Sequence, residues 1–264
     1  MIYILLPAYN EERSLEFVIP KIDNVFKESG QDYLLIVCDD GSSDETAKIL
    51  KQLEQNYPIE VLHHKINRGL GETSRDLFER AAEISKPGDV IVRLDCDDTH
   101  EPKFIPQMIA KINEGFDVVI ASRFRSGGGQ MGLNGYKTFL TYGASIFMAI
   151  FFPIKGVRDY SCGFRAYRAE TIKQAIEFFG NRFIQLKGLG FTCTLEKLIK
   201  LKLLGAKFSE VPFVLHYNQK KSKSKMVSSI TTLGYFTMVL LYHWPWGGWK
   251  AGYRDRIRKH LKRK

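Results

Sequence analysis

The chain has 264 residues, of which 44% are hydrophobic and 26% are charged, a composition typical of a folded globular protein that excludes a disordered or fibrous chain. The formal net charge is +10, but residues 220–264 hold twelve Lys and Arg against one acid, Asp255, whereas residues 1–219 hold 27 bases against 28 acids. Because the body is neutral and the surplus charge is confined to the C-terminal segment, the sequence argues against a nucleic-acid-binding protein.

Short apolar runs alternate with amphipathic segments of helical length in the first 125 residues. Strands are predicted at 2–6, 34–38, 59–62, 90–94 and 118–121, and helices near 11–28, 44–55, 70–85 and 102–114. This alternation predicts an α/β fold with a mostly parallel sheet and helices on both faces. Since the chain opens directly on a strand, we expect no signal peptide.

Polar residues follow each predicted strand. In chain order they are Pro7-Ala8-Tyr9-Asn10-Glu11, Asp39-Asp40-Gly41-Ser42-Ser43-Asp44, Asn67-Arg68-Gly69-Leu70-Gly71, Asp95-Cys96-Asp97 and Ser122-Arg123-Phe124. Because the carboxyl ends of parallel strands meet at one edge of a sheet, these groups together predict a nucleotide site. Some of them also have ordinary structural uses, since Asp44 can cap a helix and glycines permit tight turns.

Asp95 and Asp97 are the predicted ligands of a divalent metal ion. On an extended backbone, residues two apart point to the same side, so both carboxylates can hold one cation. Mg²⁺ is commonly bound by one or two carboxylates together with phosphate and water oxygens. The pattern therefore indicates Mg²⁺ or Mn²⁺ and a nucleotide diphosphate, although an Asp-x-Asp pair alone can equally be a solvated loop.

The first four of these motifs, in this order and spacing, resemble the family 2 glycosyltransferases. These are inverting enzymes of the GT-A type, with a Rossmann-like sheet, that take a sugar from a nucleotide donor. The resemblance implies that Asp95 and Asp97 hold the metal. It also implies a nucleotide-sugar site made of Pro7, Ala8, Tyr9, Glu11, Asp39, Asp40, Arg68 and Asp95.

The rest of the body resembles the polyprenyl-phosphate glycosyltransferases of the dolichyl-phosphate mannose synthase group. The motifs that carry this resemblance are Ser122-Arg123-Phe124, residues 157–168, residues 205–213 and Ser224-Lys225-Met226. It implies a catalytic domain over residues 1–219, with a nucleotide-sugar half (1–125) and an acceptor half (126–219). Two departures are visible: Thr99 replaces a frequent Gln, and Lys137 and Thr141 replace an Arg and a Ser that hold the lipid phosphate.

A lipid monophosphate acceptor requires cations rather than a base, because its second pKa of about 6 leaves it largely anionic near neutral pH. The candidates for holding it are Arg123, Lys137, Thr141 and Lys225. Asp97, Arg123 and Lys225 are the predicted catalytic residues, since they would act on the charge of the leaving diphosphate. The alternative is a hydroxyl acceptor on a glycan or glycolipid, with Asp159 as the base unless it only orients Arg158 or Arg165.

Two apolar stretches, 139–152 and 230–244, are shorter than the roughly 20 residues that a membrane-spanning helix needs. The first fits a core helix or a lipid-facing helix equally well. The second favours a membrane surface, because Trp244, Trp246 and Trp249 and then the basic tail follow it. Residues 220–264 are therefore predicted to be a membrane-associating segment, with an apolar or amphipathic helix and a basic tail. We expect a peripheral protein on the cytoplasmic face of the membrane, acting alone, as a homo-oligomer or with a membrane partner protein.

Overall fold

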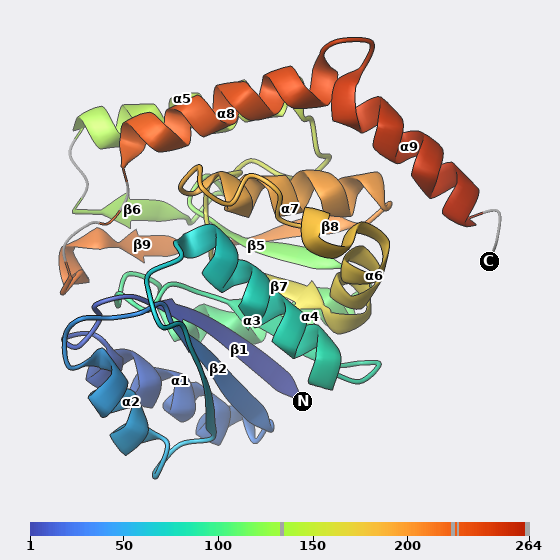
Figure 1. The fold of residues 1–264 in the computed structure, drawn as a ribbon. Coiled ribbons are helices and arrows are strands. Elements are labelled where there is room, and N and C mark those ends of the chain that lie inside the picture. Colours follow the sequence, from blue (N-terminus) through green and yellow to red (C-terminus); the bar gives the residue numbers. More distant parts are fainter. Residues whose placement is uncertain (133–134, 223–224, 226, 262–264) are drawn as a thin grey trace.

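The computed structural model describes residues 1–132, 135–222, 225 and 227–261. A seven-stranded sheet in the order β3-β2-β1-β4-β7-β5-β8 forms its centre (Figure 1). Every neighbouring pair is parallel except the two that involve β7. The strands are β1 (Ile2–Ala8), β2 (Tyr33–Asp39), β3 (Ile59–His63), β4 (Val90–Arg93), β5 (Val118–Ser122), β7 (Arg165–Arg168) and β8 (Phe208–Pro212). A separate parallel pair joins β6 (Gly129–Met131) to β9 (Val214–His216).

Helices cover both faces of this sheet (Figure 1), which confirms the predicted α/β fold with a mostly parallel sheet. They are α1 (Leu15–Ser29), α2 (Thr46–Leu53), α3 (Leu70–Ile84), α4 (Ile105–Asn113), α5 (Gly135–Phe151), α6 (Ala169–Phe179), α7 (Thr192–Leu203), α8 (Ser228–His243) and α9 (Gly248–Leu261). The helix predicted from residue 11 begins later, at Leu15. Residues before it form a turn in which the Ser14 amide donates to the Glu11 carbonyl oxygen at 3.0 Å.

The core lies on both faces of the central strands. Strand β1 is buried almost throughout, as expected for a parallel strand covered on both sides. On α1 the buried residues Val18, Ile19, Ile22 and Phe26 recur at helical spacing and form one apolar face. Burying each such side chain contributes about 1.5–3 kcal/mol.

The antiparallel strand β7 has a consequence for the site. It lies between β4 and β5 and runs against both. An antiparallel strand begins at the edge where its parallel neighbours end. The segment before β7, residues 159–164, therefore lies at the same edge as the loops that follow β4 and β5.

The C-terminal helices pack on the body of the protein. In Figure 1, α8 lies across the outer side of α7 and next to α5, and α9 continues from it. Met238 and Tyr242 of α8 are buried, as is Tyr253 of α9. In the part of the chain that the structure describes, no helix combines the length and the hydropathy needed to cross a membrane.

Gly41 illustrates how closely the strand-end loops approach one another. Its φ is +69°, and a Cβ at this position would lie 2.5 Å from the carbonyl carbon of Ile66. Gly30, at the end of α1, has a similar φ of +64° but open space around it. A substitution at Gly30 therefore tests backbone strain alone, whereas one at Gly41 tests backbone strain together with a steric clash.

We expect Gly30→Ala to cost about 1–2 kcal/mol of unfolding free energy, from the left-handed backbone alone. Gly41→Ala should cost roughly 3 kcal/mol or more, because the loop at Ile66 must also move. Urea unfolding of both variants measures the difference. Equal losses would show that the close approach of the two loops does not stabilise the fold.

Candidate functional site

The loop after β2 organises the loop after β3 through one carboxylate. Asp40 accepts hydrogen bonds from the backbone amides of Arg68 (2.9 Å) and Gly69 (2.8 Å), and its Oδ1 lies 2.6 Å from His64 Nδ1. The neighbouring Asp39 accepts from the Ser42 amide at 3.1 Å. Both aspartates are buried at the end of β2. Asp40 thus fixes the backbone of the third strand-end loop.

The guanidinium of Arg68 turns toward α3. Its Nη1 lies 3.0 Å from Asp76 Oδ2, and its Nη2 lies 3.6 Å from Glu72 Oε2. The side chain of Arg68 is partly exposed and lies at the periphery of the strand ends. These contacts place Arg68 beside two acids of α3 rather than beside the acidic loop after β4.

Asp95 is held from two sides by buried groups. Arg93 Nη2 lies 2.6 Å from Asp95 Oδ1, and His100 Nε2 lies 3.6 Å from Asp95 Oδ2. The amide of Asp95 donates to His100 Nδ1 at 3.0 Å. Burial raises the pKa of Asp95, but the charges of Arg93, His100 and Lys220 outweigh it and hold this pKa below its usual value. Burial also lowers the pKa of His100. The site therefore presents an ionised Asp95.

Arg93 also explains a glycine in the segment before β7. Its guanidinium lies so close to Gly163 that a Cβ on that residue would overlap Nη1. A larger residue at position 163 would therefore displace the group that holds Asp95.

Asp97 joins the acidic loop to a distant part of the chain. One of its oxygens accepts from the Thr99 amide (3.2 Å) and the Thr99 hydroxyl (2.6 Å). The other oxygen is in contact with Lys220 Nζ. The carbonyl oxygen of Thr99 accepts a hydrogen bond from the amide of His216 at 3.1 Å, at the end of β9. The chain just before Lys220 is thus tied to the acidic loop.

Glu11 is the third carboxylate at the carboxyl ends of the strands, and it also contacts a lysine. It is buried, accepts from the hydroxyls of Ser14 (3.0 Å) and Ser222 (3.1 Å), and contacts Lys225 Nζ. Lys225 also donates to the carbonyl oxygen of Asn10 at 3.1 Å. Burial raises the pKa of Glu11, and the contact with Lys225 opposes this only in part. Lys220, Ser222 and Lys225 therefore lie along the edge that carries Glu11, Asp95 and Asp97, which we call the acidic edge.

Each of these three carboxylates is paired with a cation: Glu11 with Lys225, Asp95 with Arg93, and Asp97 with Lys220. Burial lowers the pKa of Lys220, but the charge of Asp97, followed by those of Asp95 and Glu11, raises it above its usual value. Neither Lys220 nor Arg93 was among the residues predicted from the sequence. Arg93 could have been noticed as a charged residue directly after Val90-Ile91-Val92, and Lys220 as a member of the basic run.

Arg123 and Asp159 form a buried ion pair at the end of β5. Nε of Arg123 donates to Asp159 Oδ2, and Nη2 donates to Oδ1, both at 2.7 Å. Asp159 also accepts from the amides of Arg123 and Cys162, each at 3.0 Å. Burial raises the pKa of Asp159, but the charge and hydrogen bonds of Arg123 hold it below its usual value. Asp159 thus pairs with Arg123, a partner other than the two arginines expected from the sequence.

The remaining acceptor candidates lie on α5 and in the C-terminal segment. Thr141 is a partly buried residue of α5. The side chain of Lys137 lies outside the described residues, as do Ser224 and Met226 of the predicted motif. Their roles stay predictions.

The carboxylate oxygens of Asp95 and Asp97 are suitable ligands for a divalent cation. Among the residues that the structure describes, no group of three or more metal-binding side chains is found. Both carboxylates already hold positive groups, since Asp97 is in contact with Lys220 Nζ and Arg93 Nη2 lies 2.6 Å from Asp95 Oδ1. Two carboxylates suit Mg²⁺ or Mn²⁺ when phosphate and water oxygens complete the coordination.

The sequence model of the glycosyl transferase family 2 matches residues 3–175 of this chain. The chain belongs to this family. As a family 2 glycosyltransferase it is 33% identical over 211 residues to the dolichol-phosphate mannosyltransferase of Pyrococcus furiosus, covering 80% of this chain and 55% of that protein. It is 32% identical over 186 residues to the undecaprenyl-phosphate 4-deoxy-4-formamido-L-arabinose transferase of Proteus mirabilis, covering 66% of this chain and 51% of that protein. The chain thus spans about half the length of these relatives.

Solved structures support the fold of this family 2 member. Glucosyl-3-phosphoglycerate synthase from Mycobacterium tuberculosis, in complex with Mn²⁺, UDP and phosphoglyceric acid, has a TM-score of 0.60 at 20% identity, covering 91% of this chain and 77% of that chain. The same synthase with Mg²⁺ and UDP also gives 0.60, at 21% identity, with 91% and 78% covered. The predicted family and the predicted GT-A type of sheet are both confirmed.

The Arg123–Asp159 pair predicts a stability effect with a defined pH dependence. Asp159→Asn leaves the guanidinium buried without its counter-charge, which should cost about 3–5 kcal/mol of unfolding free energy at neutral pH. The folded pKa of Asp159 is depressed, so its contribution is present above the unfolded value of about 3.9 and is lost as pH falls through the folded value.

Urea unfolding of the wild type and Asp159→Asn at neutral pH and below about pH 4 measures this contribution. The gap between them should shrink in acid. A gap that is small at neutral pH, or that does not change with pH, would contradict the assigned ion pair.

Proposed function

We propose that this protein is an inverting glycosyltransferase that transfers a sugar from a UDP-sugar or GDP-sugar to a polyprenyl phosphate at the cytoplasmic face of a membrane. The observation that carries the proposal is the convergence of Glu11, Asp95 and Asp97 with Lys220 and Lys225 at the carboxyl edge of the sheet. The names of both relatives described above specify a sugar transferase and a polyprenyl phosphate. Their resemblance extends over most of this chain.

The donor half of the site would use the ends of β1 and β2. Ala8 pairs directly with Asp39 in the sheet, so the loops that begin at these residues lie side by side. We assign the base and ribose to Pro7, Ala8, Tyr9, Glu11 and Asp39, with Asp40 fixing the neighbouring loop. Arg68 is assigned to the rim near the base and the diphosphate.

Asp95 and Asp97 would hold Mg²⁺ or Mn²⁺. The bound ion would supply positive charge to the diphosphate oxygens as the glycosidic bond breaks. Complexes of the structurally similar synthase with UDP and either metal support this assignment. Arg93 and His100 would keep Asp95 ionised and oriented, and Lys220 and Lys225 would add cationic donors to the leaving diphosphate.

The acceptor phosphate would be held by cations, among which Arg123 is the best placed in the described residues. Its bonds to Asp159 use Nε and Nη2, which leaves Nη1 outside this pair. Lys225, Lys137 and Thr141 complete the set assigned from the sequence. A lipid monophosphate needs no protein base because it is already ionised.

The geometry of Asp159 does not favour the hydroxyl-acceptor alternative. This side chain is fully buried, and both of its carboxylate oxygens accept hydrogen bonds. Its depressed pKa also makes it a weak proton acceptor. We therefore assign Asp159 to the positioning of Arg123.

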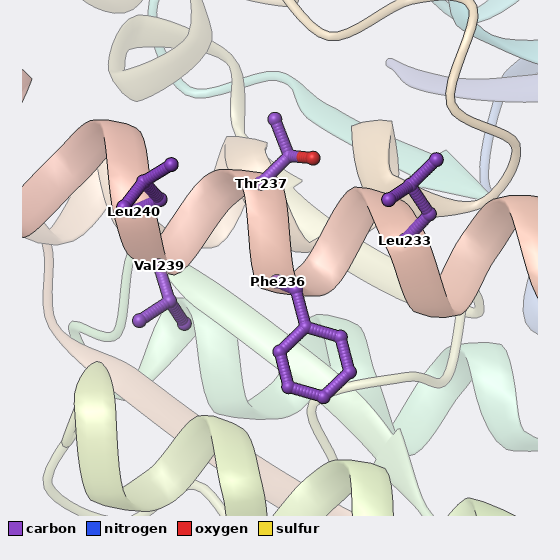
Figure 2. A pocket seen from close by; sticks show the side chains of 5 residues that line it. All are labelled: Leu233, Phe236, Thr237, Val239 and Leu240. Atoms are coloured by element: carbon purple, nitrogen blue, oxygen red, sulfur yellow. The ribbon is translucent and has the colours of Figure 1, made fainter.

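The outer faces of α5 and α8 support an association with lipid. We call them the apolar surface, and it consists of Phe139, Ile146 and Ile150 on α5 and Leu233, Phe236 and Leu240 on α8. Each of these side chains is more than half exposed. The rings of Phe147 and Phe236 lie 5.1 Å apart and join the two helices. Figure 2 shows side chains on successive turns of α8 that line an apolar pocket there.

Exposed apolar patches of this kind mark surfaces that bind a protein or a membrane. In α5, Met148 is buried while Ile146 and Ile150 are exposed, so this helix has both a core face and an outward face. The basic residues of α9 follow directly after α8 and suit an anionic leaflet. These features favour a role for residues 220–264 in membrane association.

A transfer assay tests the proposed reaction. The purified protein would be incubated with a short polyprenyl phosphate, a panel of UDP- and GDP-sugars and Mn²⁺ or Mg²⁺, and the mass of the lipid would be read with and without EDTA. We expect a gain of one sugar that is lost with EDTA. Absence of any gain across the panel, with a bound sugar nucleotide, would contradict the assigned acceptor.

Two neighbouring aspartates provide a matched comparison in that assay. Asp97→Asn should lower turnover by about 100- to 1,000-fold, because it weakens the group that stabilises the leaving diphosphate. Asp98→Asn should retain most activity, since Asp98 faces Lys21 at 2.7 Å and Asn tolerates its φ of +64°. Equal activities in the two variants would remove the metal assignment.

A further inference from the structure

A second pocket lies between α7 and α9, at the end of α5. It has a volume of about 160 Å³ and is lined by Phe152, Ile199, Lys202, Leu203, Lys250 and Arg254. Helix α7 ends at Leu203, shortly before β8 begins, and β8 runs parallel to β5. The pocket therefore lies toward the edge where the parallel strands start, opposite to the acidic edge. None of its residues belongs to the donor or acceptor site proposed above, although Lys250 and Arg254 are among the basic residues of α9.

Three cations line this pocket. Lys202 Nζ donates a hydrogen bond to the carbonyl oxygen of Pro153, and Lys202 and Arg254 are exposed. Burial lowers the pKa of Lys202, and repulsion from Lys250 and Arg254 lowers it further. Burial and the charge of Arg254 likewise lower the pKa of Lys250. In the portion of the chain that is described, none of the three forms an ion pair with a carboxylate. An anion in the pocket would relieve this repulsion.

The remaining lining is apolar and continues toward the membrane-facing side of the protein. Phe152 is buried, and its ring lies 5.6 Å from that of Tyr242 and 4.9 Å from that of His243, at the end of α8. The helix α5 that ends beside Phe152 carries part of the apolar surface. Trp244 and Trp246, both exposed, follow α8 directly. The three cations therefore lie near one end of the apolar surface.

We propose that this pocket binds a phosphate group through Lys202, Lys250 and Arg254. A pocket of roughly 10–15 Å³ suffices for one water molecule, so this one has room for a tetrahedral phosphate. Arg254 can donate two parallel hydrogen bonds to phosphate oxygens, and the lysines supply point charges. The headgroup of an anionic lipid and free phosphate present the same chemistry. The neighbouring apolar surface makes the lipid headgroup the expected source.

The experiment compares two double variants with the same loss of charge on the same helix. Lys250→Gln/Arg254→Gln removes two cations from the pocket, whereas Arg258→Gln/Lys259→Gln removes two exposed cations outside it. Lys250→Arg/Arg254→Lys keeps the charge and serves as a control for folding. The full chain is used in every case.

In the first arm, binding is measured to vesicles of phosphatidylcholine with and without phosphatidylglycerol. Both double variants should bind the anionic vesicles less tightly than the wild type, because each loses two cations near the surface. The pocket variant should lose about tenfold more affinity than the control variant, because it also loses direct bonds to the phosphate. In the second arm, the rise of Tm with inorganic phosphate is compared with that in chloride at equal ionic strength.

The outcomes of the two arms separate the sources of the phosphate. A difference between the double variants on vesicles alone assigns the pocket to a lipid headgroup, and a phosphate-dependent Tm lost only in the pocket variant assigns it to free phosphate. The charge-conserving variant should behave as the wild type does in the arm that responds. If the two double variants are indistinguishable in both arms, binding depends on net charge only and the pocket is not a phosphate site.

Discussion

The balance of charge at the carboxyl edge of the sheet is the constraint on which the site depends. The parallel pairing of β1 with β2 and β4 delivers Glu11, Asp95 and Asp97 to one edge. Carboxylates that close together repel one another unless cations lie between them. Residues distant in the sequence supply these cations: Lys220 contacts Asp97, and Lys225 contacts Glu11. The positions of Lys220 and Lys225 at this edge are therefore explained by the acids that they contact.

The same segment connects the two surfaces that matter for the proposed function. It leaves β9 at His216, provides two lysines to the acidic edge, and then leads into α8, which carries part of the apolar surface. Lys225, which contacts Glu11, lies three residues before Ser228, where α8 begins. This continuity is a physical reason for the basic and apolar residues of the C-terminal segment to lie next to one another in the sequence.

Much of the fold could be predicted because its first half depends on local patterns. Apolar runs gave the strands β1 to β5, and the spacing of Asp95 and Asp97 indicated the acidic edge. The strand β7 was missed because Arg165-Ala166-Tyr167-Arg168 is short and has no apolar run. The pairs Arg123–Asp159 and Lys220–Asp97 were also missed, since they join residues 36 and 123 positions apart. Such pairs depend on how the sheet is assembled, and no local pattern encodes them.

We propose that the acidic edge binds a nucleoside diphosphate together with a divalent cation. Calorimetric titration of the protein with UDP and with GDP, in Mn²⁺ and in EDTA, tests it without any acceptor. We expect one of the two nucleotides to bind at least about tenfold more tightly in Mn²⁺ than in EDTA, because the ion joins its phosphates to the two aspartates. Equal affinity in both solutions, or no binding of either nucleotide, would contradict the account.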